Sequence, residues 1–359
     1  MLVSRIWLTD FRNYTTAETA LAPGLTVVMG GNGEGKTSLL EAVGYLAALS
    51  SFRGAPTEAL VRHGCERAVV RAEGMRGQRE LLLEAEVPVT GRARVAVNRQ
   101  PLRRTRDLLG ALRVSVFSPD DLVLVKGSPG ERRRYLDDAL VALHPKNDVL
   151  RAELERVLRQ RNTLLRQLGG RLTAEAAPTL DVWDAKLVEA GEALAAARQA
   201  LVETLEPVLA RAYADVAGTA MAVWAHYEAP WREKGLATAL ALARADEVRR
   251  GVSLVGPQRD DLVLELEGRP ARTHASQGEQ RAFALALRLA AHQVVAAAVG
   301  EPPVLLLDDV FSELDPARSE ALVTHLPPGQ ALLTTAQALP PGAPPDLVLR
   351  VRQGRLEAA

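Results

Sequence analysis

The sequence is poor in several residue types, and each scarcity excludes a class of protein. Cys65 is the only cysteine among 359 residues, so a single chain forms neither a disulfide nor a cysteine zinc site. The formal net charge is zero, so any binding to nucleic acid must come from local clusters of charge. Only five of the 44 basic residues are lysines, which we attribute to genome base composition. The apolar share of 47% and the charged share of 25% are those of an ordinary globular protein, with one large or two modest domains.

Long uninterrupted apolar runs are also missing. Arg5 and Asp10 come too early for the apolar region of a secretory signal. The longest weakly polar run, 282–299, is interrupted by Arg288 and His292, so we do not expect it to span a membrane. We therefore expect a soluble, cytoplasmic protein with no membrane partner.

A complete phosphate-binding motif stands near the start of the chain. The β-branched run 25–29 predicts a buried strand, 30–37 fits G-x-x-x-x-G-K-[ST], and helix formers follow. In such a Walker A loop, backbone N–H groups and a helix N-terminus hold the phosphates of ATP. Lys36 is expected to reach the β- and γ-phosphates and Thr37 to bind Mg²⁺. The expected nucleotide-binding residues are Gly30, Gly31, Asn32, Gly33, Glu34, Gly35, Lys36, Thr37 and Ser38.

A second carboxylate-bearing strand completes the predicted ATPase centre. The apolar run 304–307 ends in Asp308 and Asp309, which makes it a candidate Walker B strand. We expect Asp308 to hold Mg²⁺ at the carboxyl end of the strand and Asp309 to orient or deprotonate the attacking water. Lys36, Asp308 and Asp309 are therefore the predicted catalytic residues. The alternative is an Asp-Asp pair that only caps a turn between a strand and a helix.

The segment "SQGEQ", just before the second strand, opens a long amphipathic helix. Its order between the two Walker motifs resembles the signature of ATP-binding-cassette heads, which in that family caps the γ-phosphate held by a second subunit. Ser276, Gln277 and Gly278 are accordingly predicted to bind the nucleotide of a partner copy. The structural alternative is a helix cap, in which Ser276 and Glu279 form a capping box.

Two departures from cassette heads indicate slow hydrolysis. The segment "SELD", 312–315, resembles the dimer-facing D-loop, but the second Walker B acid is Asp309 where these heads usually carry glutamate. No histidine follows "ALLTT", where many such ATPases have a switch histidine. Thr334, Thr335 and Gln337 are the candidate replacements. We expect a weak ATPase that acts as a conformational switch.

The fold expected from these patterns is α/β, an ABC-ATPase head split by an inserted helical arm. Apolar residues recur at helical spacing over 145–220, with a break at 169–179, which predicts a helical hairpin or small bundle. Alternating segments between 67 and 102 predict an antiparallel meander. The expected domains are 1–118, an ATPase lobe with Walker A and the meander, 119–245, the helical arm, and 246–359, the lobe with the signature, Walker B and D-loop.

A basic cluster between Arg92 and Arg134 is the candidate DNA contact. Four acids stand in the same segment, and aromatic residues that could stack single-stranded bases are nearly absent. The excess of seven positive charges can neutralise phosphates of a duplex without reading its sequence. The alternative is a solvated arginine surface. The basic residues are Arg92, Arg94, Arg99, Arg103, Arg104, Arg106, Arg113, Lys126, Arg132, Arg133 and Arg134.

Taken together, these segments resemble the RecF family of recombination-repair proteins over nearly the whole chain. The matching segments are "LTDFRNY", "SFRG", "VFSPDDLVLVKGSPGERRRYLD", "GPQRDDL", "SQGEQR" and "LLLDDVFSELD". The resemblance implies a protein that binds ATP and double-stranded DNA, dimerises with ATP, and works with RecR and RecO to load RecA where duplex meets single strand. Gln258 stands where the family usually has histidine, so a role of that side chain does not carry over.

Other ATP-binding classes fit less well. The nucleotide-binding subunit of an ABC transporter shares the three motifs but has a short insert and a switch histidine. A small-molecule kinase or GTPase has no use for the signature or the D-loop. A head that has lost its nucleotide would not retain Lys36, Thr37 and Asp308.

Overall fold

The structure, a computed structural model, describes residues 2–337, 339 and 344–358. These residues form two compact units. The first unit comprises Met1–Leu122, Val208–Met221 and Ser276–Ala359, and the second comprises Val123–Pro207 and Ala222–Ala275. This division differs from the three domains expected from the sequence, because residues up to Ala275 belong to the inserted unit.

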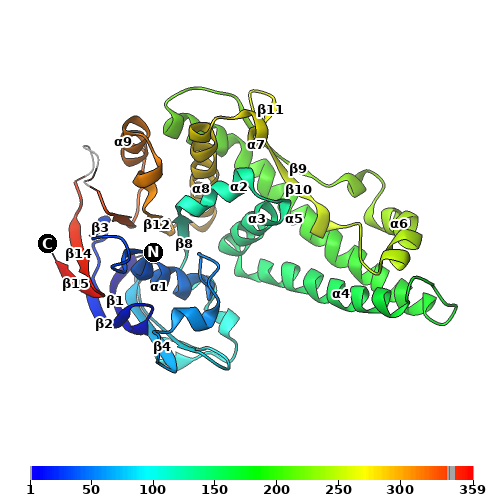
Figure 1. The fold of residues 1–359 in the computed structure, drawn as a ribbon, viewed down its shortest axis with the longest axis horizontal. Coiled ribbons are helices and arrows are strands. Elements are labelled where there is room, and N and C mark those ends of the chain that lie inside the picture. Colours follow the sequence, from blue (N-terminus) through cyan, green and yellow to red (C-terminus); the bar gives the residue numbers. More distant parts are fainter. Residues whose placement is uncertain (1, 338, 340–343, 359) are drawn as a thin grey trace. The chain divides into compact units, whose positions relative to one another are not determined.

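The first unit contains two six-stranded sheets (Figure 1). One is antiparallel, in the order β2-β1-β4-β5-β6-β7, and it contains the meander that the sequence predicted. Its strands are β1 (Leu2–Phe11), β2 (Tyr14–Ala20), β4 (Arg67–Arg76), β5 (Arg79–Pro88), β6 (Arg94–Val97) and β7 (Gln100–Pro101).

The other sheet carries the predicted Walker strands at its centre. Its order is β15-β14-β3-β13-β12-β8, and all its pairs are parallel except β14 with β15. Parallel strands bring their carboxyl ends to one edge, which is where such sheets bind ligands. The strands are β3 (Leu25–Met29), β8 (Val114–Phe117), β12 (Val304–Asp308), β13 (Ala331–Thr335), β14 (Leu347–Arg352) and β15 (Arg355–Ala358).

Helix α1 (Lys36–Ala48) lies between the two sheets, and one hydrophobic core joins all three elements. Leu39 and Leu46 of α1, Ile6 of β1 and Leu306 of β12 are at most 1% exposed. Helices α8 (Gln277–Val299) and α9 (Pro316–Thr324) complete this unit. The α/β fold class expected from the sequence is thus confirmed.

Helix α8 is long and apolar enough to cross a membrane when judged by length and composition alone. Within the unit, however, most of its apolar side chains are buried, among them Phe283 and Leu287. This burial is what a core helix shows.

The second unit is mainly helical, as predicted for the insert. It contains α2 (Val123–Lys126), α3 (Pro129–Leu143), α4 (Asp148–Gln167), α6 (Leu236–Arg250), α7 (Ala271–His274) and a sheet of β9 (Val223–Glu228), β10 (Asp261–Leu266) and β11 (Arg269–Pro270). Helix α5 (Ala177–Ala217) belongs to this unit as far as Pro207.

Buried ion pairs hold the second unit together. Arg161 of α4 is fully buried and donates to Asp184 at 2.7 Å and to Glu247 at 2.6 Å. Arg198 of α5 binds both carboxylate oxygens of Asp137 at 2.8 Å. Such charges are tolerated in a core only when they are paired and hydrogen-bonded.

Candidate functional site

The Walker A loop has the backbone that its glycines predict. Gly33 and Gly35 adopt positive φ values of 81° and 116°, which residues with a Cβ rarely reach. The loop leads directly from β3 into α1, so its N–H groups lie at a helix N-terminus. Lys36 is 7% exposed, and its Nζ donates to the carbonyls of Gly30 and Gly31 at 2.9 Å. The ammonium group is therefore held within the loop that the sequence predicts to bind phosphate.

The structure joins the Walker A and Walker B motifs by a direct hydrogen bond. Thr37 Oγ1 donates to Asp308 Oδ1 at 2.7 Å, although 271 positions separate them. Thr334 Oγ1 donates to the same oxygen at 2.8 Å. Burial raises the pKa of Asp308, while the hydrogen bonds from Thr37 and Thr334 and the charge of Arg53 act against this rise. A hydroxyl and a carboxylate at this separation fit one coordination sphere of Mg²⁺.

Asp309 has an unusual backbone conformation. Its φ of 47° lies in the left-handed region, which is uncommon for a residue with a side chain and frequent at functional sites. Its N–H donates to Thr334, and its carboxylate makes no hydrogen bond or ion pair with any residue that the structure describes. The carboxylate of Asp309 is thus available for its predicted role, which is to orient or deprotonate a water molecule.

Of the three candidate replacements for the switch histidine, Thr334 is the one that hydrogen-bonds to the Walker B acids. It bonds both Asp308 and the Asp309 backbone, whereas Thr335 Oγ1 donates to the carbonyl of Gln337. The strand β13, which carries Thr334, is hydrogen-bonded to β12 along its length. A switch at this position would therefore act through Asp308.

The signature segment forms a capped helix start. Ser276 Oγ accepts from the Glu279 N–H at 3.3 Å, and the Ser276 N–H donates to Glu279 Oε2 at 2.6 Å. This capping box is the structural alternative considered above, and it does not exclude a phosphate role. Ser276 and Gln277 are exposed at the N-terminus of the 23-residue helix α8. A Cβ on Gly278 would lie 2.5 Å from Nη1 of Arg318, so the end of that flexible side chain would have to move to admit one.

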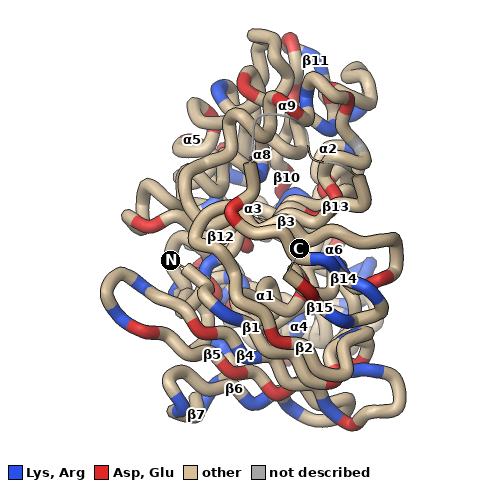
Figure 2. The backbone as a smooth tube through the Cα atoms, turned by 90° about the vertical axis from the view of Figure 1, so that its left-hand side faces the viewer, with Lys and Arg blue, Asp and Glu red and all other residues tan. Residues whose placement is uncertain are grey.

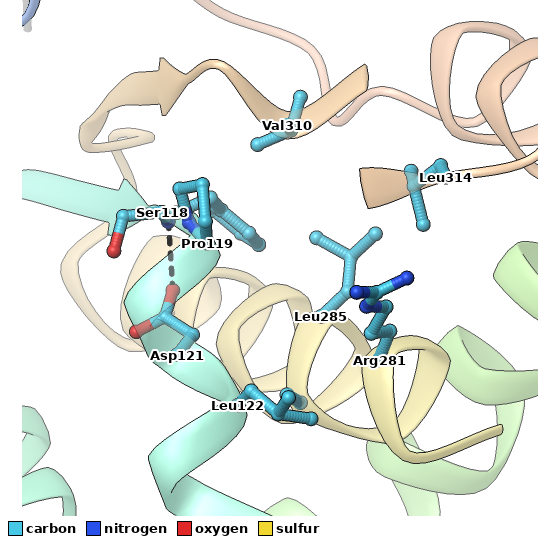
Figure 3. Close-up of a pocket in the computed structure, with 10 residues that line it drawn as sticks. Ser118, Pro119, Asp121, Leu122, Arg281, Leu285, Val310 and Leu314 are labelled. Carbon is cyan, nitrogen blue, oxygen red and sulfur yellow. Dashed lines mark hydrogen bonds between the residues drawn. The ribbon is translucent and has the colours of Figure 1, made fainter. Parts of the chain in front are cut away.

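No described contact links this segment to the Walker A loop of the same chain. Besides the bonds within the loop and into α1, the hydrogen bonds of residues 30–37 go to Asp308, to Asn13 and Tyr14, and to the β14–β15 turn. An apolar pocket flanks α8 between the 117–122 segment and the D-loop, with Leu285 and Leu314 in its walls (Figure 3). Its Asp121 is engaged by Arg288 at 2.6 Å, and no Walker A residue lines it.

The predicted basic cluster does not form one surface, which corrects the sequence interpretation. Arg132 is buried and binds both carboxylate oxygens of Asp261 at 2.7 Å. Arg133 donates to the backbone carbonyl of Asp260 at 2.8 Å, and burial lowers the pKa of its guanidinium. These two arginines hold the second unit together. The sequence count could not separate them from exposed neighbours, because charge alone does not reveal a buried partner.

Six exposed members of the cluster lie on the first unit, near the edge strand β7 of the antiparallel sheet (Figure 2), whereas the exposed Lys126 and Arg134 belong to the second unit. Arg94 is 84% exposed and lies 3.9 Å from Glu86. We call this set the edge arginines: Arg92, Arg94, Arg99, Arg103, Arg104 and Arg106.

Several residues that hold the Walker A loop and its helix were not predicted from the sequence. Arg12 binds both carboxylate oxygens of the buried Glu41 in α1 at 2.7 Å. Asn13 and Tyr14 donate to backbone carbonyls of the loop. The segment "FRNY" contributed only to the family resemblance, and no local pattern indicates these contacts.

Comparison with known proteins identifies the family. The family model described as RecF/RecN/SMC N terminal domain matches residues 2–338. The DNA replication and repair protein RecF of Streptomyces avermitilis is 45% identical over 351 residues, covering 94% of this chain and 93% of its own. RecF of Frankia alni is 46% identical over 354 residues, with coverages of 94% and 93%.

Solved structures agree with this assignment. A structure of the recombination mediator protein RecF with ATP, from the RecFOR pathway, has a TM-score of 0.91 at 27% identity, covering all of this chain and 97% of that one. The Smc head domain of Pyrococcus furiosus shares the fold, with a TM-score of 0.59 at 16% identity, covering all of this chain and 96% of that one. The chain therefore belongs to the RecF/RecN/SMC N-terminal domain family, within its branch of RecF DNA replication and repair proteins.

Proposed function

We propose that this protein is an ATP-gated clamp on double-stranded DNA. The Walker A residues Gly30–Ser38 bind the nucleotide phosphates, and Thr37 and Asp308 hold Mg²⁺, which supplies charge neutralisation for phosphoryl transfer. The bond between Thr37 and Asp308 is the observation that carries the proposal, because it places the two expected metal ligands together in the folded chain.

The second half of the nucleotide site comes from another copy of the chain. Ser276, Gln277 and Gly278 are at an accessible helix N-terminus, and no described hydrogen bond ties them to their own Walker A loop. A γ-phosphate that contacts both chains stabilises the closed dimer by its higher affinity for that state. Asp309 then positions water, and slow loss of the γ-phosphate lets the dimer open.

The edge arginines provide the contact with DNA. They are exposed, and within the described residues only Arg94 among them has an acidic partner, Glu86, so duplex phosphates can displace counterions at this edge. Binding of this kind is independent of base sequence, which suits a clamp near single-strand gaps. Following the family resemblance, the clamp works in the cytoplasm with RecR and RecO to load RecA.

Light scattering tests the nucleotide-dependent dimer. The molar mass in solution is measured with and without Mg-ATP for the wild type and for the variants Ser276→Arg and Asp309→Asn. We expect the wild type to shift from monomer to dimer, Ser276→Arg to bind ATP but stay monomeric, and Asp309→Asn to remain dimeric for longer. A wild type that stays monomeric at saturating ATP would remove the basis of the clamp.

Salt-dependent binding tests the DNA contact. The double variant Arg103→Ala/Arg104→Ala should weaken duplex binding equally for all sequences and reduce the slope of log K against log salt by about 2. Arg134→Ala, on the second unit, is the control. Equal slopes for the wild type and the double variant would place the DNA elsewhere.

A further inference from the structure

Two hairpin turns from opposite ends of the chain meet on the Walker A loop. The carbonyl of Glu34 accepts from Asn13 Nδ2 at 2.7 Å and from the Gly354 N–H at 3.2 Å. The Glu34 carboxylate also accepts from the Gln353 N–H. The carbonyl of Gly35, the next residue, accepts from the Tyr14 hydroxyl at 2.9 Å.

The packing between these segments leaves no room for added atoms. A Cβ on Gly354 would lie 2.6 Å from the Asn13 carbonyl oxygen, and a Cβ on Gly35 would lie 2.5 Å from Asn13 Nδ2. A Cβ on Gly30 would lie 2.5 Å from the Val351 carbonyl oxygen. Such separations are too short for real Cβ contacts, so the glycines permit the close approach.

The C-terminal turn is itself sharply defined. Gln353 and Gly354 have φ values of 49° and 71°, and they connect Arg352 to its pairing partner Arg355. Positive φ at both central residues is typical of a type I′ hairpin turn. Strand β14, which leads into the turn, is paired in parallel with β3, the strand that leads into the Walker A loop. The sheet therefore fixes where the turn meets the loop.

The N-terminal turn is fixed to the helix that follows the loop. Arg12, which precedes Asn13, has a two-pronged ion pair with Glu41 of α1, and Glu41 is fully buried. Ser51 also donates to Glu41. A bidentate pair to a buried carboxylate holds one geometry.

Because a trans peptide unit is planar, its carbonyl and its N–H point in opposite directions. The Glu34 carbonyl shares a peptide unit with the N–H of Gly35, and the Gly35 carbonyl shares one with the N–H of Lys36. All peptide bonds of the described residues are trans. Holding the two carbonyls from outside thus aims the two N–H groups to the inside, where a phosphate-binding loop needs them.

We propose that the Gln353–Gly354 turn, together with Asn13, is a positioning element that fixes the Walker A loop in its phosphate-binding form before nucleotide arrives. The inference rests on the proposed function, because it assigns these residues to the binding of ATP. None of them is a catalytic residue, since they act through their hydrogen bonds to Glu34. A loop that is ordered in advance loses less freedom on binding, so the turn raises nucleotide affinity and leaves the chemical step unchanged.

The test compares Gly354→Ala with a matched control in a second type I′ turn. Gly268 follows Glu267 in the β10–β11 turn, with φ values of 69° and 51°, and a Cβ on Gly268 would meet no atom within 4 Å. Gly268→Ala therefore introduces similar backbone strain without a new contact. A second pair of variants removes a turn asparagine. Asn13→Ala removes one that is hydrogen-bonded to the Walker A loop, and its control Asn98→Ala removes one that is bonded to β5 instead. Asn13→Ala adds no atoms, so it tests the proposal even if Gly354→Ala fails to fold.

Binding of a fluorescent ATP analogue and steady-state ATP hydrolysis are measured on the full chain, with thermal unfolding in the absence of nucleotide. We expect Gly354→Ala and Asn13→Ala to raise Kd and KM about tenfold and to keep kcat within about twofold of the wild type, as the loss of one or two hydrogen bonds predicts. The two controls should keep the wild-type Kd and KM. Equal Kd values for each variant and its control, or a fall in kcat with KM unchanged, would overturn the proposal.

The same measurements separate this inference from the proposed function. A wild type that binds no ATP would refute the proposed function, and with it the positioning role. A wild type that binds ATP and dimerises, with Gly354→Ala and Asn13→Ala binding equally well, would refute the positioning role alone.

Discussion

The stability of the first unit should depend on pH through one buried histidine, His292 of α8. Its side chain is 2% exposed, and Nδ1 lies 3.0 Å from Ser115 Oγ of β8. Nε2 is buried and has no hydrogen-bond partner among the described residues. A second ring proton would therefore be left buried and unsatisfied, which is costly. Consistent with this, burial lowers the pKa of His292 from 6.5 to about 4.

The sign and size of the effect follow from these two pKa values. Below pH 6.5 the unfolded chain takes up a proton at His292 while the folded chain does not, so acid favours unfolding. The stability that the neutral His292 contributes to the folded state is fully present above pH 6.5. It is lost progressively as the pH falls from 6.5 through about 4. The loss in the free energy of unfolding is about 2 kcal/mol at pH 5 and about 3 kcal/mol at pH 4.

Urea unfolding of the wild type and His292→Gln between pH 7.5 and 5 measures this loss. Glutamine keeps a polar group near Ser115 and does not titrate in this range, while all other groups titrate in both proteins and cancel in the comparison. We expect the wild type to lose about 2 kcal/mol more than the variant over this interval. Parallel pH profiles for the two proteins would show that His292 is not held neutral by burial, and would refute the reasoning.

Three further predictions concern the site and its support. Lys36→Ala should abolish measurable nucleotide binding in a calorimetric titration, because it removes the ammonium held in the Walker A loop, and retained binding would contradict that role. Arg132→Ala should lower the free energy of unfolding by about 3 kcal/mol, because it leaves Asp261 without its partner. Replacement of the exposed Arg134 by alanine should change this free energy by less than about 0.5 kcal/mol. Equal effects of the two substitutions in urea unfolding would argue against the buried pair. Leu306→Ala should cost about 2–5 kcal/mol in the same assay, because it opens a cavity in the core beneath α1, and a smaller loss would mean that the core collapses around the missing atoms.

The sequence determined those parts of the site that are local in the chain. The strand, glycine loop and helix of Walker A were predicted within a few residues, because buried strands and glycine loops have local signatures. The Walker B strand was predicted over 304–307 with Asp308 and Asp309 at its end, and β12 spans Val304–Asp308. The capped start of α8 at Ser276 was likewise anticipated as the structural alternative, since a capping box needs only residues three apart.

Tertiary structure alone decided which distant residues meet. The bond between Thr37 and Asp308 and the contact of Gln353 with Glu34 each join segments more than 270 positions apart, and no pattern within either segment encodes the other. The same holds for charge: Arg132 and Arg134 look alike in the sequence, yet one is buried against Asp261 and the other is exposed. Hydrophobic periodicity reports which face of an element is buried, whereas the identity of the partner is set by how sheets and helices pack, which depends on the whole chain.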